Sequence, residues 1–92
     1  MSGNIEVHTE THTLSPDKDS ISFVAYLDGR KVDCIITGEA LKMLPSSSRE
    51  ISDSFTENQM TIGAIAESLM KADYQHIDGE LLIGVEDIHR AP

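Results

Sequence analysis

The dipeptide Asp28-Gly29 lies between two apolar segments of equal length, residues 21–27 and 30–36. This dipeptide suits the two-residue turn of a type I′ β-hairpin, because both turn residues there have positive φ. A turn of this length leaves a single register for the two strands, and the pairing follows from it. The predicted pairs are Leu27 with Arg30, Ala25 with Val32, Phe23 with Cys34, and Ile21 with Ile36.

This register gives the hairpin two unlike faces. One face is apolar throughout, and we expect it to form the core of the domain. The opposite face mixes polar side chains with a few large apolar ones, and such a patch is a candidate contact surface. The core face carries Ile21, Phe23, Ala25, Val32, Cys34 and Ile36, and the apolar residues of the other face are Val24, Tyr26 and Ile35.

Two further strands are predicted, one before the hairpin and one near the end of the chain. Residues 5–13 alternate between two sets of side chains and include several β-branched residues, which indicates a polar edge strand. Residues 81–85 are apolar at successive positions, which favours a buried strand. We expect residues 86–92 to form a tail.

Two patterns mark helix starts between these strands. Thr37 is placed to cap a short helix over residues 38–44, which Pro45 ends because the residue before a proline avoids helical geometry. Ser47 and Glu50 have the spacing of a capping box at the start of a second helix.

The second helix is predicted from apolar residues that recur at steps of three and four. This stripe indicates one helix over about residues 49–71. Asn58 and Gln59 interrupt the stripe, and the residues that follow have low helix propensity. A break near Thr61 is therefore the alternative to one continuous helix.

The predicted order is strand, strand, strand, helix, helix, strand. Helices that are adjacent in the chain should cover one face of a small, largely antiparallel sheet, which is an α+β fold. We expect one domain over residues 1–92, with an ordered core over about 5–88 and loose ends at 1–4 and 89–92. The second face of the sheet would then have nothing in the chain to cover it.

Charge and composition exclude several classes of function. Sixteen acidic residues oppose seven Lys and Arg, a net charge of −9, which disfavours direct nucleic-acid binding. The longest apolar run, residues 23–27, is far below the roughly 18 residues of a membrane span. The first residues lack the basic and apolar segments of a secretory signal. A single Cys favours a reducing compartment, so we expect a cytoplasmic protein without a membrane partner.

Several short motifs occur along the middle of the chain: Ile21-Ser-Phe-Val-Ala, Asp28-Gly29, Val32-Asp-Cys-Ile-Ile and Gly38-Glu-Ala-Leu41, followed by Phe55, Asn58, Ile62 and Ala66. With these motifs the chain resembles the bacterial domain-of-unknown-function family 1488, over about residues 12–88. The resemblance implies a small bacterial α+β protein, and it brings no assigned activity, cofactor or functional residue.

Acidic and His residues alternate over residues 6–12, and these side chain types bind zinc or nickel. In a straight strand they share one face, but the first and the last lie about 20 Å apart, too far to converge on one ion. We favour a solvated edge strand whose charges prevent association with other sheets. Residues that would complete a site, His76 and His89, lie far along the chain. The metal candidates in the strand are His8, Glu10 and His12.

The sequence contains little that indicates catalysis. Cys34 alternates with apolar residues on the core face, where burial raises the pKa of a thiol and lowers its reactivity. There is no Gly-x-Ser-x-Gly motif and no glycine-rich phosphate loop. We therefore assign no catalytic or cofactor-binding residue, and the question of an enzyme stays open with the balance against it.

The function that these observations favour is a non-enzymatic protein–protein interaction or regulatory module. We expect a homo-oligomer, most simply a homodimer, that forms through the face carrying Val24, Tyr26 and Ile35. One alternative is a small hydrolase or isomerase with converging carboxylates and His. Another is an acidic regulator that occupies the basic site of a nucleic-acid-binding protein.

Overall fold

The structure is a computed structural model that describes residues 4–72 and 79–90 of the 92-residue chain. The described residues form an α+β fold, as predicted. In chain order the elements are β1 (Ile5–Leu14), β2 (Ser20–Leu27), β3 (Arg30–Thr37), α1 (Gly38–Lys42), α2 (Ile51–Glu57), α3 (Gln59–Ala72), β4 (Glu80–Ile83) and α4 (Val85–Arg90).

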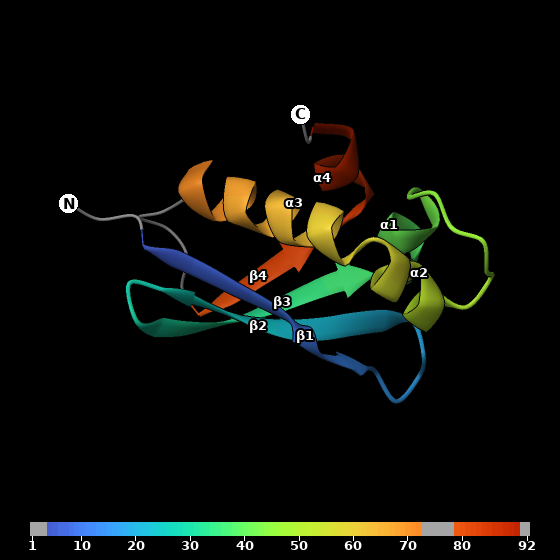
Figure 1. Ribbon diagram of the computed structural model, residues 1–92, viewed down its shortest axis with the longest axis horizontal. Helices are drawn as coiled ribbons and strands as arrows, with labels where there is room; N and C mark the ends of the chain where they lie inside the picture. Colours follow the sequence, from blue (N-terminus) through green and yellow to red (C-terminus); the bar gives the residue numbers. More distant parts are fainter. Residues whose placement is uncertain (1–3, 73–78, 91–92) are drawn as a thin grey trace.

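The strands form one sheet in the order β1-β2-β3-β4. β1 pairs with β2 and β2 pairs with β3 in antiparallel orientation, and β4 lies parallel to β3. A parallel neighbour requires a crossover connection, which the chain makes through α1, α2 and α3. Figure 1 shows the helices on one side of the sheet, while no described helix covers the other side, which we call the bare side. This arrangement is the largely antiparallel, one-sided sheet expected from the sequence.

The hairpin between β2 and β3 has the register predicted from its turn, from Leu27 opposite Arg30 onward. Asp28 and Gly29 both have positive φ, 52° and 84°, as a type I′ turn requires. Two residues therefore determine which side chains of both strands face the helices. The turn decides the faces of the whole hairpin.

The core lies between the inner face of the sheet and the helices. Phe23 of β2 packs on Phe55 of α2, with ring centroids 5.5 Å apart. Burying a large apolar side chain of this kind stabilises the fold by roughly 1.5–3 kcal/mol. The buried apolar residues include Ile21, Phe23, Ala25, Val32, Cys34 and Ile36 from the hairpin, Leu41 and Phe55, and Ile62, Ala66 and Met70 from α3.

The helix expected over residues 49–71 is two helices, broken at Asn58 rather than near Thr61. Asn58 leaves helical geometry, with φ −115° and ψ 21°. Its side-chain amide donates to the carbonyls of Pro45, at 2.7 Å, and Ser54, at 2.8 Å. The amide therefore stabilises the break from within and joins it to the loop before α2.

The capping box expected at Ser47 and Glu50 does not form. Glu50 is the N-cap of α2 but makes no side-chain capping bond. The loop folds back along α2, so that Ser47 lies near its C-terminal end and donates its hydroxyl to Glu57. By contrast, Thr37 accepts a hydrogen bond from the Ala40 N–H at the start of α1, as predicted.

Helix α4 occupies Val85–Arg90, where we expected the end of a strand and then a tail, and β4 ends at Ile83 instead of 85. Residues 91–92 of the expected tail lie outside the described residues. Asp87 accepts a hydrogen bond from the Gly84 N–H at 2.8 Å, which is half of a capping box. Ile88 packs on the core and supplies the burial that a helix this short needs. Every helix in the described residues is too short or too polar to cross a membrane.

Candidate functional site

The bare side of the sheet carries an apolar patch that we call the open face, made of Val24, Tyr26, Ile35 and Leu82. Tyr26 is 36% exposed and Leu82 is 63% exposed, while Val24 and Ile35 are half-buried. Leu82 lies directly opposite Ile35 in the pairing of β4 with β3. The open face therefore extends across the three strands from β2 to β4.

Sequence reasoning found three of these residues and missed Leu82. The run over residues 81–85 suggested a strand buried on both sides. In the structure only Leu81 and Ile83 are buried, because β4 is an edge strand and the helices cover a single face of the sheet. Period-two alternation within β4 would have placed Leu82 on the other face.

Charged side chains lie beside the apolar residues of the open face. Lys31 and Asp33, two residues apart on β3, form an ion pair at 3.8 Å and are more than half exposed. They lie opposite Tyr26 and Val24, respectively. The face thus combines apolar area with charges of both signs.

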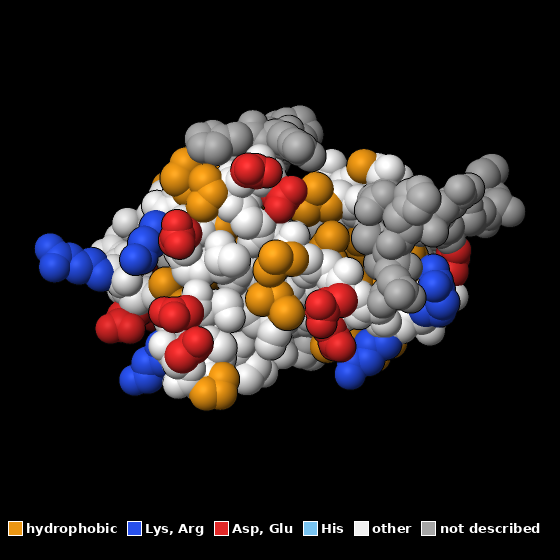
Figure 2. Space-filling view, turned by 180° about the vertical axis from the view of Figure 1, so that it is seen from behind, with side chains coloured by type: hydrophobic (Ala, Val, Ile, Leu, Met, Phe, Trp, Pro, Cys, Tyr) orange, Lys and Arg blue, Asp and Glu red, His pale blue; other side chains and the backbone are white. Residues whose placement is uncertain are grey.

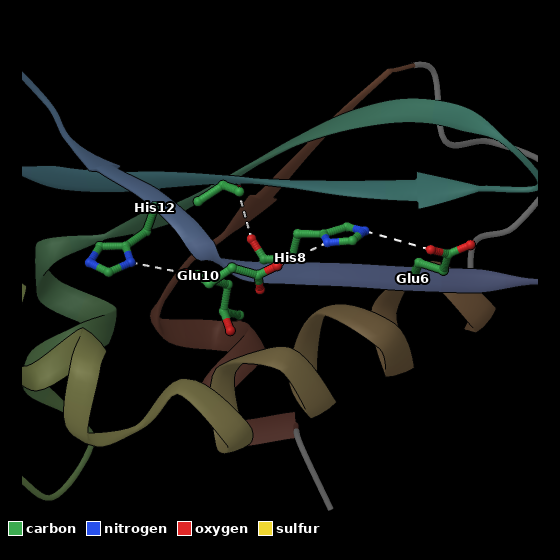
Figure 3. Close-up of polar contacts among 6 residues, drawn as sticks. Glu6, His8, Glu10 and His12 are labelled. Atoms are coloured by element: carbon green, nitrogen blue, oxygen red, sulfur yellow. Dashed lines mark hydrogen bonds and ion pairs between the residues drawn. The ribbon is translucent and has the colours of Figure 1, made fainter.

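On β1, His8 joins the open face through its neighbours. Its ring meets the ring of Tyr26 edge-on, with centroids 5.5 Å apart. Its Nδ1 lies 3.1 Å from Glu10 Oε2, and its Nε2 lies 3.6 Å from Glu6 Oε1 (Figure 3). Hydrogen bonding from the Glu10 backbone N–H, and then from His8, holds the pKa of the Glu10 carboxyl below its usual value. His8 and its two acids form a polar rim of the face.

His12 does not lie with His8, because β1 is irregular between His8 and Thr13. Four residues of β1, 9–12, lie between the His8–Val24 and Thr13–Ser22 pairs, where β2 has the single residue Phe23. Within this irregular stretch Thr11 donates its hydroxyl to the His8 carbonyl at 2.8 Å. This bulge sends His12 to the other side of the sheet (Figure 3). The prediction of one shared face for residues 6–12 is therefore wrong at His12.

On the helix side, His12 packs against Phe55, with ring centroids 4.5 Å apart. Its Nδ1 donates to the Thr9 carbonyl at 2.9 Å. Across residues 4–72 and 79–90, no three His, Cys, Asp or Glu side chains are arranged to hold a metal ion. His76 and the side chain of His89 lie outside the described residues.

Cys34 lies in the core, as the sequence predicted, and it is fully buried. Burial, and then the negative charge of Asp33, raise the pKa of the Cys34 thiol to about 12. Its Sγ donates weakly to the Val32 carbonyl at 3.9 Å. The thiol is therefore protonated at neutral pH and unreactive as a nucleophile.

Comparison with known proteins identifies the family. The family described as "Protein of unknown function (DUF1488)" matches residues 8–83, most of the chain. The chain belongs to this family. No curated protein matches this DUF1488 chain.

A solved DUF1488 protein is similar to this chain over most of its length. It is a crystal structure of a protein of unknown function from Shewanella loihica PV-4. The two chains are 24% identical, the similarity covers 90% of this chain and 94% of the other, and the TM-score is 0.66. At 24% identity the comparison shows that the two proteins share the DUF1488 fold.

Proposed function

We propose that this DUF1488 protein acts by protein–protein contact and that its open face pairs with a second copy of the chain. The observation that carries the proposal is the pairing of exposed Leu82 with Ile35 on a sheet face that no helix covers within residues 4–72 and 79–90. Apolar side chains that stay in water on one face of a two-layer fold are a surface suited to burial against a partner.

A second copy suits this face for reasons of symmetry and charge. In a two-fold pairing the same patch contacts itself, so the apolar residues of one copy meet those of the other. Lys31 and Asp33 lie side by side on the face, so an antiparallel arrangement can set Lys31 of one copy against Asp33 of the other. A domain this small also buries only about 60–65% of its surface alone, and pairing adds to that burial.

In this proposal the protein works by protein–protein contact and is located in the cytoplasm. The single Cys, free and buried, supports that location because oxidising compartments favour disulfides. The regulatory role proposed from the sequence would follow if pairing controls access of another protein to the same face.

The test is the mass of the protein in solution, measured by sedimentation equilibrium over a wide range of concentration. We expect a dimer that Leu82→Lys converts to a single chain, because the new charge would be buried in the interface. The matched control is Met60→Lys on α3, since Met60 is 91% exposed and lies away from the open face. Tyr26→Glu is a second interface variant.

Two results would refute the pairing. One is a single-chain mass for the unmodified protein at the highest concentration reached. The other is an equal loss of mass in Leu82→Lys and Met60→Lys, which would show that any added charge disrupts association. Circular dichroism of each variant shows that the fold is retained.

A further inference from the structure

A cleft of about 400 Å³ lies between α1 and the loop that leads into α2. We call it the α1 cleft and define it by five of its lining residues. Leu41, Leu44 and Ile51 form an apolar wall, and Lys42 and Arg49 bring two positive charges to it. Its volume falls within the range of about 300–1,000 Å³ that is usual for small-molecule sites.

The charge of the α1 cleft is opposite to that of the protein. The chain carries 16 acidic residues and 7 Lys and Arg, yet the residues that line this cleft include two cations and no acid. In the part of the chain that the structure describes, Lys42 and Arg49 form no ion pair. Figure 2 shows Lys and Arg side chains that project at the α1 and α2 end of the molecule, to the left in that view, with acidic side chains around them.

The loop that walls the cleft is tied down by its own hydrogen bonds. Ser46 and Ser47 donate their hydroxyls to Glu57, and Ser48 donates its hydroxyl to Asp53 at 2.9 Å. Asn58 donates to the Pro45 carbonyl at the start of the loop. The serine hydroxyl hydrogens are thus used within the loop, so the charge of a bound group has to be met by the two cations.

We propose that the α1 cleft binds a small organic anion, a carboxylate on an apolar body. Arg49 and Lys42 pair with the carboxylate, and Arg can do so with two parallel hydrogen bonds. The apolar body lies against Leu41, Leu44 and Ile51 and is removed from water there. None of the residues that line this cleft belongs to the open face, although Lys42 and Ile51 also line a neighbouring hollow that reaches Ile35 and Leu82.

The test is a titration of the full chain with sodium hexanoate, followed by the backbone amide signals in two-dimensional NMR. We expect saturable shifts confined to residues 41–54. Two matched probes separate the contributions: 1-hexanol has a similar apolar body without the charge, and inorganic phosphate has charge without the body. Hexanoate should bind roughly tenfold more tightly than either, a difference of about 1.4 kcal/mol.

The matched variants are Lys42→Gln with Arg49→Gln, and Lys71→Gln as the control. Lys71 lies on α3 in an ion pair with Glu67 at 3.0 Å, outside the cleft. The double variant should weaken hexanoate binding roughly tenfold, while the control should leave it unchanged. Because these side chains are exposed, the amide spectra should show an intact fold.

Three results would overturn the inference. Shifts that never saturate would show non-specific contact only. Equal affinity for hexanoate and 1-hexanol would show that the cations play no part, and equal affinity for phosphate and hexanoate would show the same of the apolar wall. An equal loss of hexanoate affinity in the double variant and in Lys71→Gln would show that the overall charge of the protein, and not the cleft, is responsible.

Discussion

The side-chain amide of Asn58 donates to the carbonyl of Pro45 at 2.7 Å and joins the break between α2 and α3 to the loop after α1. The same amide donates to the Ser54 carbonyl one turn back along α2. The Asn58 side chain therefore joins α2, the start of α3 and the loop after α1. The same loop forms one wall of the α1 cleft.

Asn58→Ala should lower the free energy of unfolding by about 0.5–1.5 kcal/mol, because the Pro45 carbonyl loses its partner and the Ser54 carbonyl keeps only the Asn58 backbone N–H. Urea unfolding followed by circular dichroism measures the change. The control is Gln59→Ala, the neighbouring amide, whose side chain forms no hydrogen bond within the described residues. An equal loss in both variants would contradict the role assigned to Asn58.

His12→Ala should destabilise the fold by about 1 kcal/mol, because His12 packs on Phe55 beneath the sheet. His8→Ala is the matched control on the same strand. His8 lies on the open face, where its acidic partners are exposed and its edge-on contact is with the partly exposed ring of Tyr26, so its loss should destabilise the fold less than the loss of His12. Thermal unfolding of both variants measures the two losses of stability. A larger loss in His8→Ala than in His12→Ala would contradict the placement of His12 on the helix side of the sheet.

The Cys34 thiol makes stability depend on alkaline pH. Its pKa rises from 9.0 to about 12 on folding, so between these values the unfolded chain loses a proton that the folded chain keeps. Stability from this group is therefore complete below about pH 9 and falls as pH rises toward 12, by at most about 1.4 kcal/mol per pH unit.

The measurement is urea unfolding at several pH values, with Cys34→Ala as the control. The difference in unfolding free energy between the two proteins should shrink above about pH 9. A difference that stays constant with pH would contradict the raised pKa. Ellman's reagent should also modify Cys34 slowly in the folded protein and fast in urea.

Two glycines should respond to alanine with opposite signs. Gly63 lies inside α3, where an added Cβ would meet Thr9 Cγ2 at an ordinary 3.8 Å, so Gly63→Ala should stabilise the fold by about 0.5–1 kcal/mol. At Gly38 the added Cβ would lie 2.8 Å from the Asp19 carbonyl oxygen, so Gly38→Ala should destabilise it. Thermal unfolding of the two variants measures both changes in stability. If both variants were stabilised or both destabilised, the result would contradict these contacts.

Salt should strengthen pairing through the open face. Each copy has a net charge of −9, so two copies repel each other, and salt screens the repulsion while it favours apolar contact. Sedimentation at low salt and at roughly 0.5 M NaCl should show more dimer at the higher concentration. Weaker association at high salt would contradict this expectation and indicate that contacts between opposite charges, such as Lys31 of one copy with Asp33 of the other, dominate the interface.

The sequence predicted the parts of the fold that depend on neighbouring residues. The Asp28-Gly29 turn determines the hairpin register because two residues decide the geometry of both strands. The register places Cys34 on the same strand face as Val32 and Ile36, and the Thr37 cap follows from a hydroxyl next to a helix start. Both features depend on residues close in the chain, so they can be predicted without knowledge of distant contacts.

Tertiary structure decided the features that depend on what lies opposite a residue. The bulge in β1 turns His12 onto Phe55, which is far along the chain, and alternation alone placed it beside His8. Leu82 is exposed because the described helices cover only one face of the sheet. Residues 85–90 form α4 because Ile88 packs against the core. Neighbouring residues determine local backbone geometry through steric contacts and short-range hydrogen bonds. Burial of a side chain depends instead on the packing of segments that meet only in the folded chain.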